Sequence, residues 1–200
     1  TIAPYLLPKV LPCIRGDHPD FKLTITEDQS QSLVNQLRAG DIDAAILAMP
    51  YPIDGLLSFE FWQEDFYWVC HESQHPADTG HIDGTQLASQ NLMLLKEGHC
   101  LKDHALAACQ LKIDKASLEL EGTSLHTLVQ MVAGKLGTTL IPQMAIDQLV
   151  TPMQELQAYH LNEPGPHRRI AFVVRANFGR VRDIQHLCEC FNKSLRETLN

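Results

Sequence analysis

Two cysteines, Cys100 and Cys109, are the residues of this chain best suited to redox chemistry. Charged and imidazole side chains surround the first in the run Gly98-His99-Cys100-Leu101-Lys102-Asp103-His104. Strong helix formers precede the second, so we expect a helix that begins near Cys100. The helix dipole and nearby positive charge would then favour the Cys100 thiolate. A partly exposed thiolate attacks peroxide and becomes a sulfenic acid, so the run predicts a peroxide-reactive thiol.

The expected helix would keep these two thiols apart. At about 1.5 Å rise and about 100° per residue, Cys100 and Cys109 would be about 13.5 Å apart on opposite faces. A disulfide requires Cα atoms within about 7 Å, so a bridge between them requires the helix to unwind. Cys109 lies in an apolar turn and lacks the activating surroundings of Cys100, which is typical of a resolving thiol.

Two other interpretations of the same residues remain open. Both thiols could be small buried hydrophobic groups, as most free cysteines are. Alternatively, Cys100 and His104 lie four positions apart on one helical face and could bind a metal with His99 or Cys109. The compact Cys-x-x-Cys spacing of zinc sites is missing, however, so we predict neither a metal nor a cofactor.

Composition indicates a water-soluble regulatory or binding piece of a larger protein. Hydrophobic residues make up 44% and charged residues 20% of the 200 residues. A net charge of −8 argues against direct nucleic-acid binding by this piece, since phosphate contacts need clustered Lys and Arg. There is no apolar run of membrane length and no signal peptide, so we expect a cytoplasmic protein without membrane contact. The six cysteines show no disulfide framework of short spacings (positions 13, 70, 100, 109, 188 and 190).

Apolar periodicity predicts an α/β fold. A strand at 21–27, a helix from Ser30 to Gly40 and a strand at 41–48 form a β-α-β unit, which implies a parallel sheet. A buried strand at 92–95 leads directly to Cys100, which therefore lies beyond the C-terminal end of a strand. Open α/β sheets hold their ligands at this end of the strands. Further strands are expected at 56–60, 66–71, 118–121, 138–142, 156–161 and 168–175, and further helices at 5–12, 125–132, 144–149 and 181–195. We expect two domains, residues 1–66 plus 170–200 and residues 67–169.

Three stretches together resemble the effector-binding half of LysR-type transcriptional regulators. They are Leu6-Leu7-Pro8 with His18-Pro19, the run 37–46, and the run 124–142 ending in Leu140-Ile141-Pro142. The run 97–103 followed by Cys109 is similar to the peroxide-sensing members of that family. The resemblance covers nearly the whole chain. It implies two Rossmann-like subdomains of the periplasmic-binding-protein type and an N-terminal winged helix-turn-helix domain outside these residues.

The resemblance also implies roles for the two cysteines and their neighbours. Cys100 matches the peroxidatic cysteine and Cys109 its resolving partner, while His99 and Asp103 match residues that flank the sensing site. Lys102 has no such match, and we expect it to be solvated.

Three residues far from the cysteines match pocket positions of the family. Thr1 matches a threonine in the cleft, Ser30 takes the place of another threonine, and Arg168 matches a basic residue near the thiol. Structural alternatives stay open for two of them. Ser30 is also the best N-cap of its helix, and Arg168 beside Arg169 could be a solvated pair at a strand end.

The function that the resemblance implies is that of a regulatory domain in a peroxide-sensing transcription activator. Hydrogen peroxide would oxidise Cys100, the disulfide with Cys109 would unwind the helix, and glutaredoxin- or thioredoxin-type proteins would reduce it again. Homodimers or homotetramers would bind DNA through the missing domain and act on RNA polymerase, with no enzymatic turnover. Two alternatives are an effector domain that binds an organic anion near Ser30, Thr123 and Ser124, and a thiol peroxidase.

Overall fold

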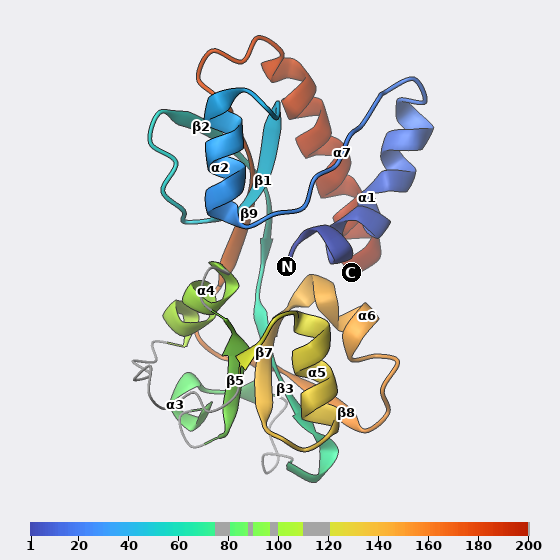
Figure 1. The fold of residues 1–200 in the computed structure, drawn as a ribbon. Helices are drawn as coiled ribbons and strands as arrows, with labels where there is room; N and C mark the ends of the chain where they lie inside the picture. The colour runs from blue at the N-terminus through green and yellow to red at the C-terminus, as the bar shows by residue number, and fades with distance from the viewer. Residues whose placement is uncertain (75–80, 88–89, 97–99, 110–120, 200) are drawn as a thin grey trace. The chain divides into compact units, whose positions relative to one another are not determined.

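The computed structural model describes residues 1–74, 81–87, 90–96, 100–109 and 121–199 (Figure 1). They form two compact units, which we describe separately. The Cys100 unit contains Thr1 and Glu64–Arg168, and the terminal unit contains Ile2–Gln63 and Arg169–Asn200. The chain therefore crosses between the units after residues 63 and 168. Among the described helices, none has both the length and the apolar character needed to cross a membrane.

The terminal unit is a three-stranded sheet covered by three helices. Its strand order is β1-β9-β2, with β1 at Ala44–Met49, β9 at Arg168–Arg175 and β2 at Leu56–Glu64. β1 and β9 are antiparallel, with Ala44 opposite Val174. The helices are α1 at Ala3–Asp17, α2 at Ser30–Ala39 and α7 at Val181–Leu199.

Alternation along the strands divides the core of this unit between two sides of the sheet. On one side, α2 packs Val34 and Leu37 against Ala45, Leu47 and Val173. On the other, the ring of Phe191 in α7 lies 5.4 Å from that of Phe61 and 5.2 Å from that of Phe172. The first and last helices of the chain, α1 and α7, lie side by side (Figure 1).

The strand predicted at 21–27 is wrong, and so is the parallel β-α-β unit built on it. These residues form no regular structure, and Leu23 and Ile25 are 44% and 47% exposed. The alternation suits a strand, but a strand also needs a hydrogen-bonding partner, and no described segment pairs with this one.

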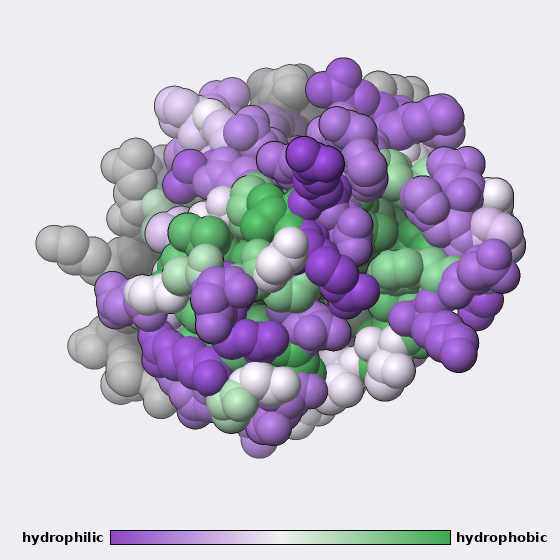
Figure 2. Space-filling view, turned by 90° about the horizontal axis from the view of Figure 1, so that it is seen from above, coloured by the Kyte–Doolittle hydropathy of each residue, from purple (hydrophilic) through white to green (hydrophobic). Residues whose placement is uncertain are grey.

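Figure 2 shows one face of the molecule, on which hydrophobic residues (green) lie between hydrophilic ones (purple).

The Cys100 unit contains a six-stranded mixed sheet with the order β4-β8-β3-β7-β5-β6. β3 is antiparallel to β7 and β8, whereas β5 is parallel to β6 and β7, and β4 to β8. In chain order the strands are β3 at Phe66–His71, β4 at His81–Ile82, β5 at Leu92–Leu95, β6 at Glu121–Gly122, β7 at Thr138–Pro142 and β8 at Leu156–Leu161.

Short helices link these strands. They are η1 at Glu72–Gln74, α3 at Gly84–Leu87, α4 at Cys100–Ala108, α5 at Leu125–Ala133, η3 at Gln143–Ala145 and α6 at Ile146–Leu149. Ser124 caps α5, because its Oγ accepts a hydrogen bond of 3.1 Å from the Thr127 amide. The strand predicted at 118–121 falls mostly outside the described residues.

Replacing Phe191 by alanine tests the aromatic packing in the terminal unit. Truncation of a large buried ring leaves a cavity, so Phe191→Ala should lower the free energy of unfolding by about 3–5 kcal/mol. The control Leu57→Ala removes a side chain that is 41% exposed and should change it by about 0.5 kcal/mol or less. Urea unfolding followed by circular dichroism measures both, and equal losses would contradict this packing.

Candidate redox site

Helix α4 begins at Cys100 and lies beyond the C-terminal end of β5, as the sequence predicts. The Cys109 amide still donates a hydrogen bond of 3.1 Å to the Ala105 carbonyl, so Cys109 continues the helical backbone. Neither cysteine is in a disulfide, and Cys100 is partly exposed whereas Cys109 is buried. Nine residues of helical rise separate them by about 13.5 Å. The structure therefore shows the pair in its unbridged arrangement.

One face of α4 is buried against the sheet and α5. Leu101, Lys102 and Ala105 face Leu94 and Leu128 around a cavity of about 10 Å³, which is about the space of one water. Lys102 is only 9% exposed, so the expectation that it is solvated is wrong. Its aliphatic stem can cover apolar neighbours, which explains how a lysine is tolerated on this face.

Asp103 occupies the first turn of α4 and is exposed to solvent. A carboxylate in this turn interacts favourably with the positive end of the helix dipole. His104, one residue later, is buried. His99 lies outside the described residues, so its predicted place beside Cys100 stays a prediction.

Cys109 lies close to Gly84 and within the electrostatic influence of Glu163, two residues from distant parts of the chain. The Gly84 amide donates a hydrogen bond to Glu163 Oε1. A Cβ at Gly84 would lie 2.5 Å from both the Cys109 carbonyl oxygen and Glu163 Oε1, so only glycine fits there. Burial raises the pKa of the Cys109 thiol to about 12, and the Glu163 carboxylate adds to this increase. Cys109 is therefore held as a neutral thiol, which disfavours it as the attacking group.

Arg168 is buried and forms an ion pair with Glu64. Its Nε donates a hydrogen bond of 2.9 Å to Glu64 Oε1, and its Nη2 donates to the same oxygen. Glu64 Oε2 accepts a 3.0 Å hydrogen bond from the Met144 amide. The guanidinium carbon also lies 6.0 Å from the centre of the Phe66 ring. The ion pair thus fixes the Arg168 guanidinium, together with its counter-charge, inside the Cys100 unit.

The alternative of a solvated Arg168–Arg169 pair is wrong for Arg168. Neighbouring residues of a strand point to opposite faces, which places Arg168 inside and leaves the Arg169 side chain 43% exposed. Arg169 forms its own pair with Glu60, at 3.1 Å. Arg168 Nη1 is buried without a hydrogen-bond partner among the described residues.

The other two predicted pocket residues belong to different units. Thr1 groups with the Cys100 unit, whereas Ser30 lies in the terminal unit at the first position of α2. Their approach to Cys100 stays a prediction. The N-cap role considered for Ser30 is wrong, because Gln29 is the N-cap residue. The Asp28 carboxylate accepts hydrogen bonds from the Ser32 hydroxyl and the Gln29 amide, and these lower its pKa.

Sequence reasoning missed Glu64 and Glu163. Glu64 ends β2 at a buried position, but in sequence it stands between Gln63 and Asp65, so no local pattern distinguishes it from a solvated residue. Glu163 follows the last residues of β8 in a polar turn, and no local pattern connects it with Cys109. Only the three-dimensional fold brings Glu163 close to Cys109.

Removing the charge of Glu64 tests the buried ion pair. Glu64→Gln leaves the buried Arg168 cation without a counter-charge and should lower the free energy of unfolding by about 3–5 kcal/mol. Glu60→Gln makes the same chemical change in the exposed pair with Arg169 and should cost about 1 kcal/mol or less. Denaturant unfolding of both variants gives the comparison. Similar costs would show that Arg168 is not buried with Glu64.

Removing the charge of Glu163 tests its effect on Cys109. Glu163→Gln keeps the acceptor oxygen for the Gly84 amide but removes the negative charge, so the pKa of Cys109 should fall below about 12. The pH dependence of Cys109 alkylation, followed by peptide mass spectrometry, measures this change. Glu155→Gln, elsewhere in the same unit, is the control and should leave the profile unchanged. An unchanged profile in both variants would contradict the assigned contact.

Known proteins resemble this chain over nearly its full length. A "Probable hydrogen peroxide-inducible genes activator" from Streptomyces viridosporus is 34% identical over 199 residues, which are 98% of this chain and 64% of that protein. The "HTH-type transcriptional regulator EstR" from Acinetobacter baylyi is 36% identical over 176 residues, which are 88% of this chain and 58% of that protein. The chain therefore spans only part of the length of these curated relatives.

A solved structure shows the same fold. A hydrogen peroxide-bound cysteine-to-serine mutant of Corynebacterium glutamicum OxyR aligns with a TM-score of 0.91 at 31% identity, covering 100% of this chain and 63% of that one. Two units, each built from a sheet and helices, agree with the two-subdomain fold that the sequence predicts. The model of the LysR substrate binding domain family matches residues 1–196, and this chain belongs to that family.

Proposed function

We propose that this chain is the regulatory domain of a hydrogen peroxide sensor of the OxyR type, with Cys100 as the reacting thiol and Cys109 as its partner. The observation that supports it best is the placement of two cysteines without a disulfide at the two ends of α4. The first is partly exposed and the second is buried with a raised pKa. Relatives named as peroxide-inducible activators and the peroxide-bound OxyR structure give independent support.

The chemistry proceeds in two balanced steps. In the first, the Cys100 thiolate attacks one peroxide oxygen, the O–O bond breaks, and the departing hydroxide takes up a proton to become water. The product is Cys100 sulfenic acid. In the second, the Cys109 sulfur attacks the Cys100 sulfur, the S–O bond breaks, and a second water leaves. One peroxide is thus reduced and one disulfide formed, so the output is a conformation and not repeated turnover.

The second step requires α4 to open. The sulfur atoms must move from ends about 13.5 Å apart to bonding distance, with Cα atoms within about 7 Å. Cys109 must also leave its contact with Gly84 and lose the neighbouring charge of Glu163. Leaving this contact lowers its pKa and makes it a better nucleophile. Opening the helix therefore both brings Cys109 closer and activates it.

The supporting residues keep the roles that the resemblance implies. We assign peroxide hydrogen bonding to the hydroxyls of Thr1 and Ser30, and proton handling beside Cys100 to His99 and Asp103. Arg168 supplies positive charge in the Cys100 unit, and its pairing with Glu64 supports this role by holding the guanidinium in one place. Each role is tested by replacing one residue and measuring the rate of Cys100 oxidation.

The whole protein would transmit the change to DNA. In this proposal the terminal unit is regulatory subdomain I and the Cys100 unit is subdomain II. A winged helix-turn-helix domain outside these residues contacts DNA, and homodimers paired as tetramers change geometry when α4 unwinds. RNA polymerase is the downstream partner, glutaredoxin- or thioredoxin-type proteins reset the disulfide, and the protein acts in the cytoplasm.

Cysteine replacements test the proposed reaction. After about one equivalent of hydrogen peroxide, the reduced protein should lose two thiols that peptide mapping assigns to a Cys100–Cys109 bridge. Cys100→Ser should abolish this bridge, and Cys109→Ser should stop at a sulfenic acid that dimedone traps. Cys70→Ser is the matched control, since burial raises the pKa of Cys70 to about 11. A Cys100→Ser protein in which peroxide still oxidises Cys109 or unwinds α4 would overturn the proposal.

One relative favours a second candidate function. EstR is named as a transcriptional regulator without reference to peroxide. A small organic anion bound near Ser30, Thr123 and Ser124 would make this chain an ordinary ligand-gated regulator. Mass spectrometry of the purified protein would then find a bound metabolite, and mild peroxide would leave the Cys100 and Cys109 thiols intact.

A further inference from the structure

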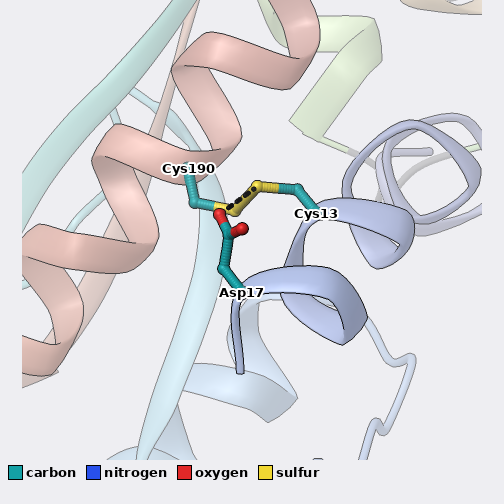
Figure 3. A group of neighbouring side chains, drawn as sticks. All are labelled: Cys13, Asp17 and Cys190. Atoms are coloured by element: carbon teal, nitrogen blue, oxygen red, sulfur yellow. Dashed lines mark hydrogen bonds between the residues drawn. A yellow bond between two sulfur atoms is a disulfide. The ribbon is translucent and has the colours of Figure 1, made fainter. Parts of the chain in front are cut away.

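A second pair of cysteines lies in the terminal unit, away from the proposed reaction. Cys13 of α1 and Cys190 of α7 form a disulfide, although 177 residues separate them in sequence (Figure 3). Their Cα atoms are 6.5 Å apart, which is within the range that a disulfide accepts. Unlike the Cys100–Cys109 pair, this pair needs no unfolding to form a bond. The side-by-side packing of α1 and α7 already brings the sulfurs together.

An aspartate one helical turn after Cys13 sets the chemistry of this pair. Asp17 Oδ2 lies 3.4 Å from Cys13 Sγ. In Figure 3 the Asp17 carboxylate points toward the disulfide. In the reduced protein, the Cys13 thiol can donate a hydrogen bond to this carboxylate. The negative charge also disfavours a neighbouring thiolate, which is the form that reacts with peroxide. Asp17 therefore stabilises the reduced pair and slows its oxidation.

A neighbouring cysteine shows that the pairing is selective. Cys188 lies two residues before Cys190 on α7 but remains a free thiol. Its sulfur is 3.9 Å from the Phe59 carbonyl oxygen, and burial raises its pKa to about 11. Two residues that lie two positions apart on a helix point in different directions, so of these two cysteines only Cys190 faces α1.

We propose that Cys13 and Cys190 are a second redox-active pair, which hydrogen peroxide or another two-electron oxidant closes slowly into a clasp between α1 and α7. Two thiols lose two protons and two electrons, the O–O bond of one peroxide breaks, and two waters form. A dithiol reductant reverses the reaction by disulfide exchange. The proposal goes beyond the Cys100 reaction and does not depend on it.

The clasp would act on the stability of the terminal unit. This unit is assembled from the two ends of the chain, Ile2–Gln63 and Arg169–Asn200. A bridge that closes a long loop restricts the unfolded chain and stabilises the folded state. Oxidation at this pair should therefore hold the two chain ends together, whereas oxidation at α4 should open local structure. The same oxidant would have opposite effects on the two units.

Peptide mapping in a Cys100→Ser protein isolates this second pair. The reduced protein is treated with increasing hydrogen peroxide, and the Cys13–Cys190 bridge is quantified against time. We expect the bridge to form, and to form about tenfold faster in Asp17→Asn, where the negative charge is gone. Asp20→Asn is the control, because it removes an exposed carboxylate just beyond α1 and should leave the rate unchanged.

Thermal melting supplies a structural readout that does not depend on the rate. The oxidised protein should melt about 5–10 °C higher than its reduced form, and Cys190→Ser should remove this difference. Free thiols at positions 13 and 190 under excess peroxide would overturn the proposal, and so would equal rates for Asp17→Asn and Asp20→Asn. Stoichiometric zinc bound by the reduced protein and lost in Cys13→Ser would instead assign Cys13, Asp17 and Cys190 to a metal site and also overturn it.

Discussion

The length of helix α4 is the constraint on which the rest of the account depends. A helix from Cys100 to Ala108, continued by the backbone of Cys109, is too long for its two thiols to bond while it stays folded. A helix this short has little stability of its own in water, so its packing keeps it folded. That packing consists of Leu101 and Ala105 against the sheet, and of the contact between Cys109 and Gly84. Breaking these few contacts is a modest cost, which a new covalent bond can offset.

In the proposed reaction, the surroundings of α4 would remain in place when the helix opens. The Glu64–Arg168 pair and the fully buried strand β7 lie in the same unit and do not belong to the helix. Lys102 and the small cavity beside it are different, because they form part of the helix contact itself. Under the proposal, opening this one short helix beside the sheet would turn a chemical change at a single sulfur into a local conformational change.

Local signals in the sequence were sufficient for the elements that carry the proposed chemistry. Helix propensity placed the start of α4 near Cys100, and apolar periodicity placed β5, β7 and α5. The strand predicted at 21–27 was wrong because alternating hydrophobicity indicates a possible strand but does not show whether a partner strand exists. The remaining site features depend on contacts across long sequence distances, such as Arg168 with Glu64, Cys109 with Glu163, and Cys13 with Cys190. Local patterns in a single sequence do not report such long-range contacts. Which charged residues are buried could therefore be learned only from the fold.

Hydrogen exchange of the α4 amides tests the central claim most directly. The backbone amides of residues 104–109 should be protected in the reduced protein and should lose that protection after about one equivalent of hydrogen peroxide. Cys109→Ser, which can form the sulfenic acid but not the bridge, should keep its protection under the same treatment. Full protection of α4 in a protein shown by peptide mapping to contain the Cys100–Cys109 bridge would contradict the account.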